Sequence, residues 1–265
     1  MTPRPILAAL SLLSLIACSG KAPPAMSYGS TSTPPPIHYD QTSVLTVEGQ
    51  PQEERSYHRL RDDCQKAGVA MHALTPDEEG KVGRSHVEAW IGPDKQSRHE
   101  EEWHLADSTP CQFSLTHTDQ TQIDDANGRA TVIDAITHQV DVQELGKPAP
   151  VAALPTSDGE LTEGERQAGW RKQSTASANG SQCTIWEDSS GFQLCVWAGG
   201  RQWGYSADGP TSLKDGLSRS DSVVLWAHPG RGPGWKLETR EFTVGAALDP
   251  RAFALPANAA HGESP

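Results

Sequence analysis

The sequence CTIWEDSSGFQLCVW, residues 183–197, contains two short β-rich runs separated by polar turn residues. A three-residue turn at Asp188–Ser190 folds the two runs back on each other, because Asp and Ser favour turns. In the resulting hairpin Cys183 and Cys195 lie opposite each other, at a separation that a disulfide can bridge. We therefore predict an antiparallel hairpin closed by a Cys183–Cys195 disulfide.

The chain has five cysteines, and setting Cys18 aside leaves an even number. In an oxidising compartment this number indicates two disulfides, for which three connectivities are possible. We predict Cys64–Cys111 together with Cys183–Cys195, because the second pair flanks the hairpin. A zinc site built on these thiols is disfavoured, since the sequence contains no C-x-x-C pair.

A second hairpin is predicted in the first half of the chain. Residues 112–123 and 129–142 are joined by Asp-Asp-Ala-Asn-Gly, in which Asn127-Gly128 supplies the positive φ angles of a tight turn. Six further runs are rich in strand-forming residues: 43–48, 69–74, 85–91, 101–105, 222–227 and 235–244. The predicted fold class is therefore mainly β with a few short helices, as a curved antiparallel sheet or half-barrel.

The best helix candidate is residues 52–67. Its larger apolar groups, Tyr57, Leu60 and Cys64, lie on one narrow stripe, and Gly68 can end the helix. A shorter helix is predicted over residues 162–173.

The N-terminus has the pattern of an export signal. An apolar run over residues 6–17 follows Arg4 and is shorter than the ~20 residues that a membrane-spanning helix needs. The run ends in Leu-Ile-Ala-Cys at residues 15–18, which resembles the bacterial lipobox, whose cysteine is acylated and becomes the first mature residue. The resemblance implies two or three acyl chains on Cys18. That number is enough for lasting attachment, whereas one chain alone binds a membrane only weakly. An ordinary secretory signal with a chance cysteine is the alternative.

The resemblance also implies a location. In lipobox proteins an Asp after the cysteine tends to hold the chain in the inner membrane, and here that position is Ser19. We therefore expect an outer-membrane lipoprotein that faces the periplasm, with surface display left open. Residues 19–36 consist largely of Gly, Pro, Ser, Thr and Ala, so they lack the apolar surface needed to offset ordering entropy.

These boundaries predict an organisation in six parts. They are a lipoprotein signal peptide (1–17), a flexible tether (18–37), a β-rich first half with one helix (38–146), a linker (147–160), a β-rich second half (161–257) and a disordered tail (258–265). Whether the two halves form one domain or two stays open.

The charge of the chain narrows the classes of partner. The formal net charge is −12, and removing Arg4 with the signal makes it about −13, which disfavours nucleic acid and anionic lipid. A basic protein partner is compatible with this charge, although plain solubility is the simpler explanation. The oligomeric state stays open.

Six of the eight tryptophans lie after residue 160. Tryptophan buries a large area and often keeps its N–H near a surface or cavity. These residues either form the core of the sheet or line an apolar groove for acyl chains or a partner peptide. The candidate groove residues are Trp186, Trp197, Trp226 and Trp235.

The end of the chain resembles the second half of LolA/LolB-like lipoprotein-carrier folds. Short matches carry this resemblance: the Gly-x-x-Cys-Thr-x-Trp pattern of residues 180–186, Cys-Val-Trp at 195–197, Leu-Glu-Thr-Arg at 237–240 and the Asp-Pro turn with its Phe-x-Leu-Pro exit within 248–256. It implies a curved sheet that forms an incomplete barrel, which in the carriers encloses acyl chains. This chain departs from them by its own lipobox, two predicted disulfides and an acidic first half, so the resemblance implies a fold and no functional residues.

We find no catalytic constellation in the sequence. Residues 204–208 begin like a G-x-S-x-G elbow but end in Asp, and there is no H-E-x-x-H. His86 with Glu88, and Glu102 with His104, each share a strand face and could bind a metal, although such pairs also occur on solvated sheet surfaces. We predict no catalytic residue, no metal site and no cofactor.

The predicted function is a non-catalytic, lipid-anchored periplasmic binding protein of the outer membrane. It contacts the membrane through Cys18 and binds an acyl or apolar ligand, or a protein. The alternative is a periplasmic immunity or inhibitor lipoprotein that neutralises a secreted toxin or hydrolase, since an acidic domain can block a basic cleft. An enzyme is the least favoured class.

Overall fold

The computed structural model describes residues 33–106, 110–144, 163–200 and 222–255, together with the short pieces 161, 203, 205, 213–214, 216–218 and 260–261. The predicted signal peptide with Cys18, most of the predicted tether and the linker 147–160 lie outside the described residues. Within the described part, no helix combines the length and the apolar character needed to cross a membrane.

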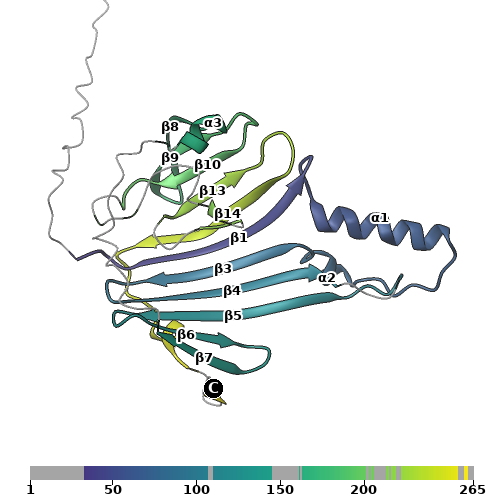
Figure 1. Cartoon of the computed structure of the whole chain (residues 1–265), viewed down its shortest axis with the longest axis horizontal. Coiled ribbons are helices and arrows are strands. Elements are labelled where there is room, and N and C mark those ends of the chain that lie inside the picture. Colours follow the sequence, from purple (N-terminus) through teal and green to yellow (C-terminus); the bar gives the residue numbers. More distant parts are fainter. Residues whose placement is uncertain are drawn as a thin grey trace, which may run out of the picture. The chain divides into compact units, whose positions relative to one another are not determined.

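One large sheet contains strands from both halves of the chain (Figure 1). Its strands are β1 (Ile37–Val47), β2 (Gln50–Pro51), β3 (Arg84–Ile91), β4 (Lys95–Leu105), β5 (Leu115–Asp125), β6 (Arg129–Asp134), β7 (Gln139–Glu144), β8 (Arg171–Ala178), β9 (Ser181–Glu187), β10 (Gln193–Trp197), β13 (Val224–His228), β14 (Gly234–Val244) and β15 (Ala260–His261). The order is β15-β7-β6-β5-β4-β3-β1-β14-β13-β10-β9-β8, with β2 beside β1.

Nearly all neighbouring strands of this sheet are antiparallel, as predicted, and the described strands do not close into a barrel. The mainly β class and the curved, open antiparallel sheet are therefore confirmed. β1 lies between β3 and β14, so the two halves meet within the sheet. The exception in direction is β15, from the predicted tail, which pairs in parallel with β7. A separate small ladder joins β11 (Leu213–Lys214) and β12 (Leu217–Ser218).

Among the described residues, three helices and the 3₁₀ turn η4 accompany the sheet. They are α1 (Gln52–Lys66), α2 (Pro76–Glu79), α3 (Glu163–Gln167) and η4 (Pro250–Phe253). The predicted helix over 52–67 is thus confirmed to within one residue, and Gly68 follows it with a φ of 66°. The second predicted helix is shorter than expected, because β8 begins at Arg171.

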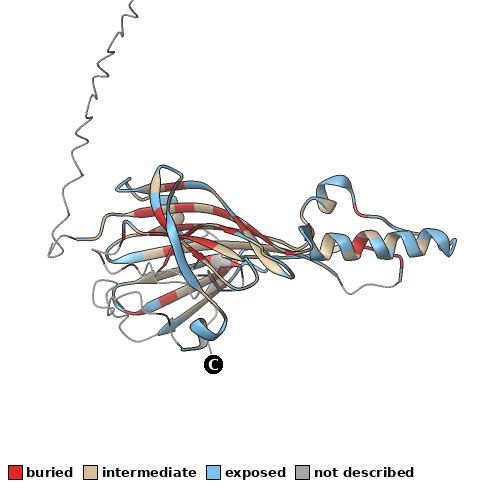
Figure 2. Ribbon diagram, turned by 90° about the horizontal axis from the view of Figure 1, so that it is seen from above, coloured by how far each residue is buried: buried red, intermediate tan, exposed pale blue. Residues whose placement is uncertain are grey.

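Helix α1 extends beyond one end of the sheet in both views and is mostly exposed or half-buried (Figures 1 and 2). Of the predicted stripe, Tyr57 is buried against Leu74, Val82 and Phe113, and Cys64 packs against this cluster. Leu60 is 42% exposed, so that part of the prediction is wrong. The buried stripe of α1 is narrower than predicted, because only the face of the helix that carries Tyr57 packs against the residues between α1 and β5.

Both predicted disulfides are present, Cys64–Cys111 and Cys183–Cys195, with Cα atoms 5.8 and 5.4 Å apart. The hairpin differs from prediction in detail. Cys183 is in register with Trp197 and Cys195 with Ile185, so the cysteines are diagonal neighbours on one face.

The loop between β9 and β10 spans residues 188–192 and is longer than the turn that we predicted. Asp188 explains the extra length, because its carboxylate accepts hydrogen bonds from the backbone N–H groups of Ser190 and Phe192, at 2.8 and 2.9 Å. Such a local side-chain-to-backbone bond stabilises a wider loop.

The predicted hairpin of residues 112–142 also differs from the structure. Its second arm is divided into β6 and β7 by a turn at 135–138, where Ile136 is 52% exposed. In the first turn Gly128 has a positive φ of 85°, whereas Asn127 does not. Residues 69–74 form a single bridge, His72 to Gln112, rather than a strand.

Candidate functional site: a histidine–carboxylate surface

One face of the central strands carries histidine and carboxylate side chains in alternation. Directly opposed residues in antiparallel strands project to the same face. His86 in β3 opposes Glu101 in β4, which in turn opposes Asp119 in β5. We call the whole set the histidine–carboxylate surface; it consists of His38 and Asp40 (β1), His86 and Glu88 (β3), His99 and Glu101 (β4), and His117 and Asp119 (β5).

His86 lies at the centre of this surface and joins three strands. Its Nε2 is 3.0 Å from Oδ1 of Asp40, and its Nδ1 is 3.1 Å from Oε2 of Glu101. His86 in β3 therefore links a carboxylate of β1 to a carboxylate of β4.

The chain of contacts continues to β5. Oε1 of Glu101 is 3.4 Å from Nε2 of His117. Nε2 of His99 is 2.9 Å from Oδ1 of Asp119. The His117 ring stacks on Trp103 with 5.0 Å between the ring centres and 2° between the planes. The stacking limits rotation of the imidazole, so the ring edge that faces Glu101 is held in place.

A second arm of the surface reaches β14. Nε2 of His38 is 2.9 Å from Oε1 of Glu88, and its Nδ1 is 3.5 Å from Oε1 of Glu241. The ring also stacks on Trp90 at 5.1 Å. His38 therefore repeats the arrangement of His117, with an indole on one side and carboxylates around its edge.

The pairs predicted from the sequence prove only partly relevant. His86 and Glu88 do share a face, as their spacing in β3 indicates. The carboxylates that contact His86, however, are Asp40 and Glu101 from the neighbouring strands. Sequence reasoning missed the trio of Glu101, His117 and Asp119, although the His-x-Asp spacing at 117–119 was a usable signal.

The other predicted pair, Glu102 and His104, lies on the opposite face of β4 because strand residues alternate. There Nδ1 of His104 is 2.8 Å from Oε1 of Glu53 in α1, and its Nε2 is 3.7 Å from Oε2 of Glu102. The hydrogen bond to Glu53 raises the pKa of His104 above its ordinary value of 6.5, and Glu102 adds to the effect.

We expect Glu53→Gln to lower the pKa of His104, because it removes the carboxylate that stabilises the imidazolium. With the folded pKa above the unfolded one, the pair stabilises the protein fully below pH 6.5 and loses this effect as the pH rises through the folded pKa. Since about half of the His104 side chain is exposed, solvent screening keeps the effect on stability small. An NMR titration of His104 measures the shift, with Glu54→Gln as the control; an unchanged titration contradicts the assignment.

The four candidate groove tryptophans do not share a face. Trp186 packs in one core cluster, with Leu194 and Leu237, and Trp235 projects to that face as well. Trp197 belongs to the other core cluster, against which Trp226 packs. No single groove can therefore contain all four.

A pocket of about 220 Å³ lies on the face opposite the histidine–carboxylate surface. Its lining is mixed and includes Tyr39, Ile91, Arg98 and Asp124. Arg98 donates to the backbone oxygen of Ser218 at 2.8 Å, and burial raises the pKa of Tyr39. The volume is below the ~300–1,000 Å³ that is typical of small-molecule sites. This pocket is too small and too polar for an acyl chain.

Comparisons with known proteins add no assignment. No protein-family model matches this chain, and no curated protein matches its sequence.

Proposed function

We propose that this chain is a non-catalytic, lipid-anchored binding protein of the bacterial outer membrane, facing the periplasm, which binds a basic protein partner. The observation that carries the proposal is the lipobox-like motif ending in Cys18, followed by a sheet whose histidine–carboxylate surface is only half-buried. The curved, open sheet fits the architecture that the resemblance to lipoprotein carriers implies, and that resemblance remains a prediction.

The two disulfides support an oxidising location. Both cysteine pairs are within bonding distance. Disulfides persist in the periplasm and outside the cell but are rare in a reducing cytosol. A chain that carries an export signal and two disulfides is consistent with the cell envelope.

A protein partner fits the described residues better than an acyl ligand does. Trp186 and Trp197 are buried within core clusters, so their apolar area already packs against the sheet. The histidine–carboxylate surface instead offers acidic groups, and the chain as a whole has a net charge of −12. Complementary charge raises association rates and selects partners of opposite sign.

A periplasmic immunity or inhibitor protein is the specific form of this binding function that the same charge favours. Toxins and hydrolases with basic clefts are the matching partners. An adjacent gene for such a secreted enzyme supports the immunity or inhibitor function. An ordinary envelope protein bound at the surface supports a general protein-binding function instead.

The anchoring is tested by Cys18→Ser in the full-length chain. We expect the variant to lose labelling with palmitate and to move from the membrane fraction to the soluble fraction, because the acylated sulfur is gone. Ser19→Ala is the matched control and keeps both properties. A Cys18→Ser variant that still incorporates palmitate and sediments with membranes contradicts the anchor.

The binding is tested by crosslinking the wild-type chain in intact envelopes and identifying the attached partner by mass spectrometry. A basic protein whose crosslinking decreases at high salt is the expected result, since salt screens surface charges. Native mass spectrometry that shows a bound lipid and no protein contradicts a protein partner.

A further inference from the structure

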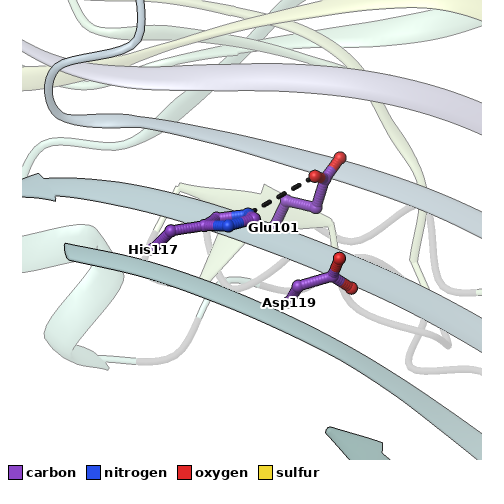
Figure 3. A group of neighbouring side chains, drawn as sticks. All are labelled: Glu101, His117 and Asp119. Atoms are coloured by element: carbon purple, nitrogen blue, oxygen red, sulfur yellow. Dashed lines mark ion pairs between the residues drawn. The ribbon is translucent and has the colours of Figure 1, made fainter. Parts of the chain in front are cut away.

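Glu101, His117 and Asp119 bring three metal-ligating atoms to one place on β4 and β5. One ligand atom from each side chain lies within 4.8 Å of the other two. Figure 3 shows the three side chains on the same side of the two strands, with the ion pair between His117 and Glu101 marked. Because Glu101 opposes Asp119 in the ladder, and His117 is two residues before Asp119, the register of the sheet fixes this arrangement.

We propose that Glu101, His117 and Asp119 bind a divalent transition-metal ion, with zinc as the best fit. The donor set is one imidazole nitrogen and two carboxylate oxygens, which leaves a fourth position for water or a partner's side chain. Imidazole favours zinc and its neighbours, whereas calcium and magnesium take oxygen ligands, usually more of them. This proposal does not depend on the lipid anchor, and it concerns part of the surface that we propose for the protein partner.

The distances require only side-chain adjustment. Zinc bonds of about 2.0–2.2 Å place tetrahedral ligand atoms about 3.4 Å apart. The three atoms are within 4.8 Å of one another, so closing the site moves them by an ångström or so. Glu101 can provide most of this movement by rotation about its side-chain bonds, while His117 remains stacked on Trp103.

Neighbouring histidines already orient both carboxylates. His86 contacts Oε2 of Glu101 at 3.1 Å and leaves Oε1 facing His117. His99 contacts Oδ1 of Asp119 at 2.9 Å. Hydrogen bonds of this kind hold ligands in place around protein metal ions, and removing one weakens metal binding about 10- to 100-fold.

Charge and burial also favour a cation at this position. Glu101 and Asp119 are each 23% exposed in their side chains and His117 is 35% exposed, so the group is open to ions yet partly shielded from water. Two carboxylates held close together repel each other, and the repulsion grows as solvent is excluded. A divalent cation between them removes this repulsion.

The experiment measures zinc binding to the purified chain, prepared without a histidine tag and dialysed against chelator. Isothermal titration calorimetry with zinc is expected to show one site per chain, and cobalt substitution a tetrahedral visible spectrum. Asp119→Asn and His117→Gln are expected to weaken zinc binding by more than about 100-fold, and His99→Gln by about 10-fold. His104→Gln is the matched control, because it removes a histidine–carboxylate pair of the opposite face, and it leaves the affinity unchanged.

Folding of each variant is checked by circular dichroism. A ¹⁵N NMR spectrum of the wild-type imidazoles gives a second readout that needs no variant, since zinc shifts the bonded nitrogen of His117. The proposal is overturned if the wild-type protein binds no zinc, if His104→Gln weakens binding as much as His117→Gln does, or if zinc shifts other imidazoles and leaves His117 unchanged.

Discussion

Replacing Trp197 with alanine is expected to lower the free energy of unfolding by about 3–5 kcal/mol, the usual cost of truncating a buried aromatic side chain. Trp197 is 3% exposed and belongs to the core cluster that also contains Phe242, from β14, and Ile91, from β3. The centre of its ring is 5.2 Å from the ring centre of Phe242, in an edge-on arrangement, and 5.5 Å from the ring centre of Tyr205.

The size of this effect follows from the position of the indole. The cluster joins residues from both halves of the chain. The cavity left by alanine is therefore surrounded by side chains of β1, β3 and β14 as well as of β9 and β10. The disulfide between Cys183 and Cys195 lies on the same face and restricts the collapse that would otherwise fill the cavity.

Urea unfolding of the oxidised protein measures the effect of Trp197→Ala. Leu60→Ala is the control, since Leu60 is an exposed apolar residue of α1, and its effect is expected within about 0.5 kcal/mol. A loss below about 1 kcal/mol for Trp197→Ala, or equal losses for both variants, contradicts the core position of Trp197.

Removing the Cys64–Cys111 disulfide by a double substitution to alanine is expected to lower the free energy of unfolding by about 4 kcal/mol. The bond closes a chain segment with a sequence separation of 47, compared with 12 for Cys183–Cys195. A longer closed loop restricts the unfolded chain more, and the same relation gives about 3 kcal/mol for the shorter loop.

The first disulfide also has a local role. It ties the C-terminal half of α1 to the segment before β5, next to the small cluster around Tyr57. Since α1 extends beyond the sheet and buries little else, we expect the double variant to become sensitive to proteolysis within α1 before the sheet unfolds.

Urea unfolding of the two double variants and limited proteolysis followed by mass spectrometry check these expectations. The Cys183→Ala/Cys195→Ala variant is the matched control, because it removes one disulfide and leaves α1 tied down. Early cleavage within α1 in the control, or none in the Cys64/Cys111 variant, contradicts the local role.

The local elements of this fold were accessible from the sequence. Helix α1 was predicted because its apolar spacing and the glycine at its end are local features, and β3 and β14 because their residues favour extended structure. Local reasoning was weaker where a side chain that bonds the nearby backbone makes a turn within an apolar run. Ile136, an apolar residue expected within a strand, lies instead in an exposed turn, where Asp134 accepts backbone hydrogen bonds.

The candidate site could be predicted only in part, because its side chains come from strands that are distant in the sequence. Alternation along β3 and β4 assigns His86 and His99 to strand faces, but it does not say which strand lies alongside. The partners of His86 come from positions 46 residues before it and 15 residues after it. No single stretch of sequence contains this set.

The sequence by itself determined the β class and the helix α1, because each depends on residues near one another in the chain. It also determined both cysteine pairs, because a local hairpin pairs Cys183 with Cys195 and an even number of thiols leaves Cys64 with Cys111. The lipobox-like N-terminus stays a prediction. The tertiary structure alone decided that both halves share one sheet, that Trp186 and Trp197 face opposite cores, and that Glu101 meets His117 and Asp119. Pairing register is the physical reason: a shift of one residue between β4 and β5 moves every side chain of one strand to the other face.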